Sequence, residues 1–389
     1  MASVSGAQYT FSAALPVNVV ATPDGTNLPP PVSGNFNLEL VTLASGTNYP
    51  VPAGYDGVAL FPNGDASTLN LLHGNIGVTD SGGNDTILAG DGSDTINAIA
   101  GNDSIQLGSG NATVFGGAGD TITAGAGSAL IDGTKGNMSI TIGSAGTDSI
   151  FSGAGDTILG GAASANIVGV KGDTISLGSG SGSDTVNAFA GNEKVMLGSG
   201  ASTEFGGVGD TITAGAGSAL IDGTLGNMSI TIGSAGTDTI FSGAGDTILG
   251  GTGNANIIGA AGDTISLGSG NGNDTVNALA GNERVTLGGG HSIVFGGTND
   301  TITAGGGTAD IILSGSNHQF VDSSNVYADT LTGFSQPGGD RIHLTTDTVS
   351  NALAHSTLVN GGHDTLITLS DSSTILLKGI TSINSTFFN

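Results

Sequence analysis

The chain has 389 residues, of which 72 are glycine and only 4% are aromatic, so an ordinary globular core built around large aromatic side chains is excluded. Its 32 acidic and 6 basic residues give a formal net charge of −26, which repels phosphate backbones and anionic lipid, so we expect no nucleic-acid partner. The absence of cysteine excludes a disulfide framework and a cysteine-based zinc site.

Residues 1–78 hold most of the nine prolines and show none of the periodicity that follows them. We interpret them as an N-terminal capping or assembly segment, in which "FNLELVTL" and "GVALFP" can supply an edge strand to a neighbouring subunit. The N-terminus has no Lys or Arg ahead of its apolar residues and no sustained apolar run, so we expect no Sec-type signal peptide. No stretch approaches the roughly 18 consecutive apolar residues of a membrane helix, so we expect no membrane insertion.

Residues 79–312 form an internal repeat. The stretches "AGAGSALIDGT" and "GNMSITIGSAGTD" each occur twice, 90 residues apart, and a partial third copy follows. Within each copy one large apolar residue recurs about every nine residues, as at Ile96, Ile105, Phe115 and Ile122, between glycine-rich connections. One short strand and one turn fit this step, whereas several glycines per segment would destabilise a helix.

Alternate steps differ in the residue that lies two positions before the apolar one. In one series this residue is nearly always acidic, and in the other it is mostly neutral. Such a difference is expected if alternate strands begin on opposite edges of a coil. The sequence therefore predicts an all-β fold, a parallel β-roll or β-solenoid with about 18 residues per coil, flanked by N-terminal and C-terminal β-rich caps.

The acidic series requires compensation of its charge, because stacked strands lie about 4.8 Å apart. Two carboxylates at that distance repel by roughly 3.5 kcal/mol at an effective dielectric constant of about 20. The repeat region offers only Lys135, Lys171, Lys194 and Arg284 as basic partners. Hard divalent cations, held by carboxylate and carbonyl oxygens, would neutralise such a series.

Three stretches, "AGDGSDTIN" at 89–97, "SGSGSDTVN" at 179–187 and "SGNGNDTVN" at 269–277, resemble the nonapeptide of the RTX (repeats-in-toxin) family, glycine-glycine-x-glycine-x-aspartate-x-aliphatic-x. The resemblance covers about residues 80–312. It implies that the glycine-rich half of each repeat is a turn whose carbonyl groups and aspartate bind Ca²⁺ between successive coils. Other turns depart from the motif: "GGAGDTI" lacks one residue before its aspartate, and "AGAGSALI" has Ala129 in place of it.

The candidate Ca²⁺ ligands are the repeated aspartates. The fuller turns carry Asp94, Asp148, Asp184, Asp238 and Asp274. The acidic series carries Asp85, Asp103, Asp120, Asp156, Asp173, Asp210, Asp246, Asp263 and Asp300. A structural alternative stays open for each of them, because aspartate commonly accepts hydrogen bonds from backbone N–H groups in its own tight turn.

Residues 313–389 are predicted to form a C-terminal β cap. The stretch "GFSQPGGDRIHL" and the apolar end "STFFN" resemble the C-terminal part of many RTX proteins, where an uncleaved secretion signal follows short strands. The resemblance implies type I export and a secreted or cell-surface location. Because ordering a glycine-rich coil loses much entropy and two buried aliphatic side chains return little, we expect Ca²⁺ binding to be coupled to folding outside the cell.

No catalytic signature is present, since the six histidines lack HExxH spacing and the acidic residues are periodic rather than local. We interpret the histidines as surface residues and expect no enzyme activity. The leading hypothesis is a secreted, calcium-stabilised structural protein that assembles as a homo-oligomer or polymer into a surface layer, matrix or filament, with cell-surface polysaccharide as a further partner. An RTX adhesin, or a module that binds ice or glycans through a flat threonine array, is the alternative. A calcium module attached to an enzyme ranks lowest.

Overall fold

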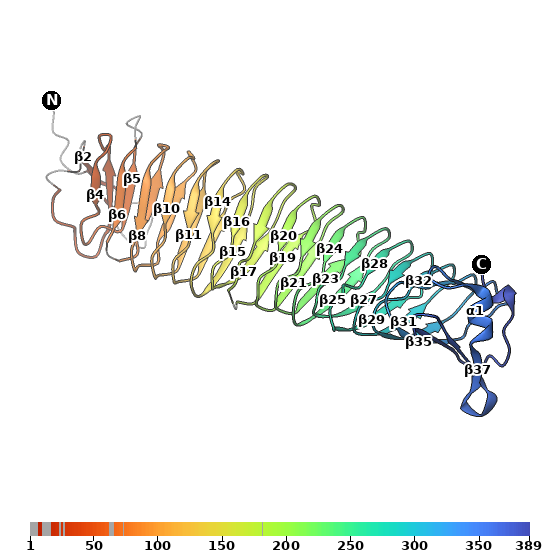
Figure 1. Ribbon diagram of the computed structural model, residues 1–389. Helices are drawn as coiled ribbons and strands as arrows, with labels where there is room; N and C mark the ends of the chain where they lie inside the picture. The colour runs from red at the N-terminus through yellow and green to blue at the C-terminus, as the bar shows by residue number, and fades with distance from the viewer. Residues whose placement is uncertain are drawn as a thin grey trace. The chain divides into compact units, whose positions relative to one another are not determined.

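The computed structural model describes residues 7–9, 17–22, 25, 28–61, 66–72, 74–180 and 182–389. The chain divides into two units, residues 1–187 and 188–389. In each unit short strands alternate between two sheets, here named sheet A and sheet B, and the strands of successive coils lie side by side (Figure 1).

Unit 1 contains strands of both kinds of sheet. Its strands in sheet A are β1 (Ala7–Tyr9), β2 (Val17–Thr22), β3 (Phe36–Val41), β5 (Gly57–Leu60), β7 (Gly77–Asp80), β9 (Thr95–Ala98), β11 (Ala112–Gly116), β13 (Ala129–Asp132), β15 (Thr147–Phe151), β17 (Ser164–Val168) and β19 (Asp184–Ala188), whose last residue belongs to unit 2. Its strands in sheet B are β4 (Asn48–Pro50), β6 (Thr68–Leu71), β8 (Thr86–Ala89), β10 (Ser104–Gln106), β12 (Thr121–Thr123), β14 (Ser139–Thr141), β16 (Thr157–Leu159) and β18 (Thr174–Ser176).

Unit 2 repeats this arrangement. Its strands in sheet A are β21 (Ser202–Gly206), β23 (Ala219–Gly223), β25 (Thr237–Ser242), β27 (Asn254–Ile258), β29 (Asn273–Ala278), β31 (His291–Gly296), β33 (Thr308–Leu313), β35 (Ala328–Thr332), β37 (Ser356–Val359), β38 (Asp364–Thr368) and β39 (Thr374–Leu377). Its strands in sheet B are β20 (Lys194–Met196), β22 (Thr211–Thr213), β24 (Ser229–Thr231), β26 (Thr247–Leu249), β28 (Thr264–Ser266), β30 (Arg284–Thr286), β32 (Thr301–Thr303), β34 (Gln319–Val321) and β36 (Arg341–His343). The helical turns are α1 (Val349–Ala354), η1 (Asn360–Gly362) and η2 (Ser385–Phe387).

The core is a ladder in which one aliphatic residue per strand stacks on its equivalent in the next coil. In sheet B of unit 1 the paired and buried residues are Ile87, Ile105, Ile122, Ile140, Ile158 and Ile175. In sheet A they are Val78, Ile96, Val114, Ile131, Ile150, Ile167 and Val186. Successive partners in sheet B are 17 or 18 residues apart, which confirms the predicted parallel β-solenoid with about 18 residues per coil.

Unit 2 has a core of the same kind with one exception. Its sheet A ladder consists of Ile221, Ile240, Ile257, Val276, Val294, Ile311 and Leu331. The residue that pairs with Ile221 from the preceding strand β21 is Glu204, which is fully buried. An acidic residue therefore occupies a position that aliphatic residues fill in the other strands of this ladder.

One step of the predicted periodicity is wrong by one residue. We expected Phe115 to be the core residue of its strand, but Val114 is fully buried and Phe115 is 41% exposed. The parallel register pairs Val114 with Ile96 and Ile131, so the strand turns its smaller β-branched residue inward. The interior between the sheets is lined by aliphatic residues of this size, and the bulkier phenyl ring lies outside.

Antiparallel strands flank the parallel ladder of sheet A. Strand β1 pairs antiparallel with β2 in unit 1, and β39 pairs in parallel with β35 and then antiparallel with β38, which pairs with β37. Helix α1 is capped by Thr348, whose hydroxyl accepts a hydrogen bond from the Asn351 N–H. These elements supply the predicted β-rich caps, which cover strand edges that could otherwise pair with another chain.

The described part of residues 1–78 joins the same ladder. Strands β2, β3, β5, β7 and β9 pair in parallel across residue 79, so the predicted boundary there marks a change in sequence composition and not in strand pairing. Within the described residues, no helix has the length and apolar character that crossing a bilayer requires.

The interpretation of the histidines as surface residues is wrong for His318, which is buried. Its Nδ1 lies 2.8 Å from Asp340 Oδ1, and its Nε2 contacts the carbonyl oxygens of Gly297 and Ser314. These contacts give His318 a structural position in the C-terminal part of unit 2. His73 lies outside the described residues.

Candidate calcium sites

Two kinds of turn connect the sheets, and the alternation of strands places them on opposite edges. Most turns that lead into a strand of sheet B end with a residue of the acidic series, and we name these turns together the acidic edge. The acidic edge includes Asp85, Asp103, Asp120, Asp156, Asp173, Glu193, Asp210, Asp246, Asp263, Glu283 and Asp300. Turns that enter sheet A form the glycine edge, which includes Asp94, Asp148, Asp184, Asp238 and Asp274. The predicted assignment of the two series to opposite edges is thus confirmed.

On the acidic edge most aspartates close their own turn and tie it to the preceding coil. Asp120 Oδ2 accepts a hydrogen bond from the Gly117 N–H at 2.7 Å, and its Oδ1 accepts one from the Asp103 N–H at 2.8 Å. The same two bonds form at Asp156, Asp173, Asp210, Asp246, Asp263 and Asp300. Both oxygens of these carboxylates are therefore engaged by the backbone, as in the structural alternative.

Two of these aspartates receive a third donor. Ser152 Oγ donates to Asp173 Oδ2 at 2.5 Å, and Ser242 Oγ, 90 residues later, donates to Asp263 Oδ2 at 2.5 Å. Burial raises the pKa of Asp156 above its usual range, and that of Asp246 to about 6, although their N–H donors act in the opposite direction. The acidic edge is thus a buried ladder of carboxylates and N–H groups.

The glycine edge holds carboxylates of two kinds. In the turns "GSAGTD", Asp148 and Asp238 accept N–H bonds at both oxygens, from Ala129 and Gly143 in the first case. In the three turns that resemble the RTX nonapeptide most, the backbone N–H bond that Asp94, Asp184 and Asp274 accept from the described residues goes to Oδ1. Their second oxygen is thus not committed to a backbone N–H.

The clearest case is Asp94, which is 2% exposed. Its Oδ1 accepts a hydrogen bond from the Ile76 N–H at 2.8 Å, whereas its Oδ2 is buried and has no hydrogen-bond partner. A buried carboxylate oxygen without a partner destabilises the fold unless a proton or a cation reaches it. Burial raises the pKa of Asp94, which reflects the same cost of holding the charge without a partner.

Glycines bring carbonyl oxygens close to this turn. A Cβ atom on Gly92 would lie 1.4 Å from the Gly74 carbonyl oxygen, and one on Gly110 would lie 1.9 Å from the Gly92 carbonyl oxygen. Only glycine therefore permits the turns of successive coils to stack here. The result is a column of carbonyl oxygens beside a carboxylate with a spare oxygen, and Ca²⁺ prefers such a set of oxygen donors.

Comparison with protein families agrees with this geometry. A family model of the RTX calcium-binding nonapeptide repeat, in four copies, matches residues 79–114, 99–121, 142–164, 173–204 and 266–294. Residues 79–294 thus contain stretches that resemble RTX calcium-binding repeats. RTX repeats bind Ca²⁺, so the residues and the family lead to the same ion. Comparisons with curated proteins and with solved structures gave no significant match.

The similarity to RTX repeats also bears on location. RTX-repeat proteins are typically secreted through type I systems, which suggests an extracellular location for this chain. β-Solenoids of this family are typically structural or toxin-like.

We expect Asp156→Asn and Asp94→Asn to differ in their dependence on calcium. The first replaces an acceptor for the Gly153 N–H by an amide donor and should destabilise the fold by about 1–2 kcal/mol with or without Ca²⁺. The second should lower stability only when Ca²⁺ is present, because it replaces a carboxylate that we expect to bind the ion. Thermal melts in calcium and in chelator would measure both. Asp246→Asn is the matched control for Asp156→Asn. If Asp156→Asn or Asp246→Asn lost stability only in calcium, the assignment of these two aspartates to backbone hydrogen bonds would be contradicted.

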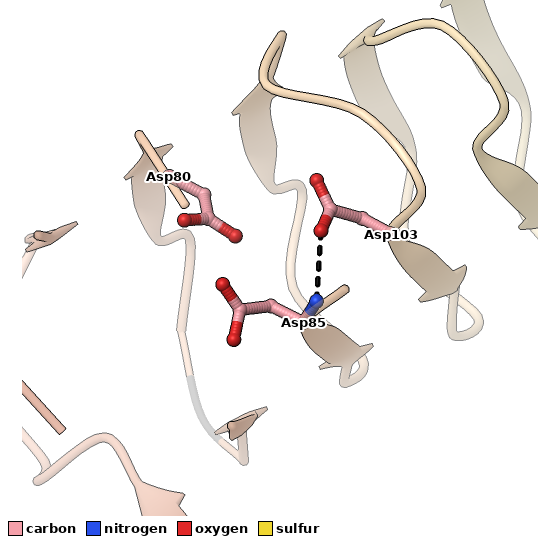
Figure 2. Close-up of side chains that lie close together, drawn as sticks. All are labelled: Asp80, Asp85 and Asp103. Atoms are coloured by element: carbon pink, nitrogen blue, oxygen red, sulfur yellow. Dashed lines mark hydrogen bonds between the residues drawn. The ribbon is translucent and has the colours of Figure 1, made fainter. Parts of the chain in front are cut away.

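The structure brings Asp85 and Asp103 together with a residue that the sequence did not single out, Asp80 (Figure 2). One carboxylate oxygen from each of the three lies within 4.8 Å of the others, and all three residues are buried. Burial and the neighbouring carboxylates raise the pKa of Asp80 to about 8 and that of Asp103 to about 7. Among the described residues this is the one such group of three metal-ligating side chains.

Proposed function

We propose that this protein is a secreted, calcium-stabilised structural protein that assembles with copies of itself into a surface layer, an extracellular matrix or a filament. One observation carries the proposal, an exposed apolar row on the outer face of sheet A. In unit 1 paired strands place Asn97, Phe115, Asp132, Phe151 and Val168 in register along this row. In unit 2 the corresponding row is Phe205, Asp222, Phe241, Ile258, Asn277, Phe295 and Ile312.

The row is unusual for a chain with so few aromatic residues. Phe115, Phe151, Phe241 and Phe295 are between 36% and 46% exposed. Phe115 and Phe151 lie two strands apart, or about 10 Å, with Asp132 between them. Aligned exposed apolar side chains commonly mark surfaces that contact another protein.

Charge opposes such contact unless it is neutralised. A formal net charge of −26 makes copies of the chain repel one another, and a divalent cation screens or bridges that charge. Assembly would therefore depend on Ca²⁺ in two ways, because the ion supports folding of the coils and reduces the repulsion between copies. Type I machinery would export the chain before it meets millimolar Ca²⁺, and a surface polysaccharide could retain it.

The double variant Phe151→Ser/Phe241→Ser should remain monomeric in millimolar Ca²⁺, where we expect the natural chain to form large assemblies. Removing two rings from the outer row takes away apolar contact area without touching the buried ladder. Light scattering and electron microscopy of purified protein would measure the change. Leu159→Ser/Leu249→Ser is the matched control, since these leucines are 43% and 45% exposed on sheet B and should be dispensable. Undiminished assembly of the phenylalanine variant would refute the role of this row.

A second candidate, a module that binds ice or glycans, is favoured by the outer face of sheet B. Strands β12, β14 and β18 read "TIT", "SIT" and "TIS", and their parallel register aligns the hydroxyl residues in two rows. Leucine interrupts one row at Leu159 in unit 1. Thermal hysteresis or glycan binding by the monomeric phenylalanine variant would favour this function over self-assembly.

A further inference from the structure

The interior acidic cluster formed by Asp80, Asp85 and Asp103 differs from both kinds of repeated turn. Asp80 is the last residue of strand β7 and points inward, as Val78 does. The strand before it has Leu60 in this position, and the strands after it have Ala98 and Gly116. Asp80 is therefore a single acidic residue at a position that the neighbouring coils fill with uncharged residues.

Its surroundings add two more carboxylates. Asp85 and Asp103 belong to successive turns of the acidic edge, and the Asp85 N–H donates to Asp103 Oδ1 at 2.8 Å. Figure 2 shows the Asp80 and Asp85 carboxylates facing one another, with Asp103 on the next coil. The three residues are between 1% and 4% exposed, and none of them takes part in an ion pair among the described residues. Three adjacent buried carboxyl groups thus have no basic side chain to balance them.

Unpaired oxygens show where a ligand would bind. Asp80 Oδ1 accepts a bond from the Gly82 N–H, and Asp85 Oδ1 accepts one from the Ser67 N–H. The Oδ2 atoms of Asp80 and Asp103 are buried and have no hydrogen-bond partner. At the acidic-edge aspartates from Asp120 onward, the equivalent second oxygen is held by an N–H group of its own turn.

We propose that Asp80, Asp85 and Asp103 bind one divalent cation inside the coil, separate from the ions of the glycine edge. Oxygen donors alone, and three carboxylates among them, favour a hard cation, and Ca²⁺ tolerates irregular oxygen geometry better than Mg²⁺ does. Strand β7 begins two residues before the region matched by the RTX repeats. The ion would connect this strand to the first two repeat turns. The inference rests on the proposed calcium-stabilised architecture and adds an interior site to it.

Asp80→Ala tests this site with a side chain that the next coil already accepts at Ala98. Native mass spectrometry of the full chain in calcium should count one ion fewer than in the natural protein, and the calcium-dependent rise in melting temperature should be smaller. In chelator the variant should melt at the same temperature as the natural chain or higher, because one of three repelling carboxylates is gone. Asp132→Ala, which removes an equal charge from the outer face of sheet A, should leave ion count and calcium response unchanged.

Each outcome separates this site from the wider proposal. If the natural chain and Asp80→Ala bind the same number of ions with the same calcium response, the cluster holds a shared proton instead, and the interior site is refuted while calcium stabilisation stands. If neither protein binds calcium, the interior site and the calcium-stabilised function both fail. A variant that is less stable in chelator would also overturn the site, since it would show that Asp80 supports the fold without an ion.

Discussion

Glu204→Val should stabilise the protein by about 2–4 kcal/mol at neutral pH. Glu204 is fully buried in the ladder of sheet A, where it pairs with Ile221, and both of its carboxylate oxygens lack a hydrogen-bond partner. Valine occupies the equivalent position 90 residues earlier and later, at Val114 and Val294, and is fully buried at both. The substitution therefore removes an unsatisfied polar group and adds apolar contact in a site shaped for it. Chemical denaturation would measure the gain.

The gain should grow as the pH rises. Burial, together with Asp210 and Glu193 nearby, raises the pKa of Glu204 well above 4.5. Below about pH 4 the carboxyl group is protonated in both folded and unfolded chains, so the two proteins differ least there. Above that pH the unfolded chain loses the proton and the folded chain retains it, which progressively destabilises the natural protein. Denaturation curves between pH 4 and pH 8 should therefore diverge.

Val114→Glu and Val294→Glu are the reciprocal controls. Each places the same side chain at the same position of another coil and should destabilise the fold by a similar amount. A loss of stability in Glu204→Val that appears only in calcium would contradict the prediction, because it would show that Glu204 holds an ion.

Removal of calcium should unfold most of the repeat region. An ion present at about a thousand times its Kd stabilises the folded state by about 4 kcal/mol per site. The three turns with an uncommitted oxygen, at Asp94, Asp184 and Asp274, would together contribute a free energy comparable to the whole stability of an ordinary domain. Circular dichroism should therefore lose its β-sheet signal after prolonged dialysis against chelator and regain it in millimolar Ca²⁺.

A matched pair of triple variants would locate the effect. Asp94→Asn/Asp184→Asn/Asp274→Asn should abolish most of the calcium response, whereas Asp156→Asn/Asp246→Asn/Asp300→Asn should lower stability and retain the response. The second set loses N–H acceptors of the acidic edge and keeps the spare oxygens of the glycine edge. A spectrum and melting temperature that chelator leaves unchanged would refute calcium-coupled folding.

Periodicity alone predicted the coil length, the two edges and most of the core, because each coil repeats the same packing problem. It failed at Phe115, because Val114 and Phe115 are adjacent apolar residues and the β-branched Val114, nine residues after Ile105, is the one that points inward. The same ambiguity concealed Glu204. Phe205 is the apolar residue of that strand and would be taken as its core residue, but Glu204 is the one that is fully buried. Alignment of the three copies would have shown valine, glutamate and valine at one position.

Two features of the site were beyond the reach of the pattern. Asp80 precedes the first full repeat, and its proximity to Asp85 and Asp103 depends on the end of strand β7. The difference between Asp94 and Asp148 depends on whether a turn N–H reaches the second carboxylate oxygen, which is a property of turn conformation. The aspartate is the same in both cases and the turn sequences differ, but the sequence alone does not show which turn conformation brings an N–H group to the second oxygen.

In the repeat region, the backbone N–H bonds to aspartate carboxylates that join successive coils run one way along the chain. Asp103 accepts from the backbone of Asp85, and Asp148 accepts from that of Ala129, so a coil relies on a carboxylate supplied by the coil that follows it. Both ends of the array expose unpaired strand N–H and C=O groups, but a coil with no successor also leaves its turn N–H donors unmet, whereas loss of the predecessor frees carboxylate oxygens that water readily solvates. The array therefore has a polarity. We expect the coils to fold from the C-terminal side toward the N-terminal side, and truncation at the C-terminal side to reduce stability more.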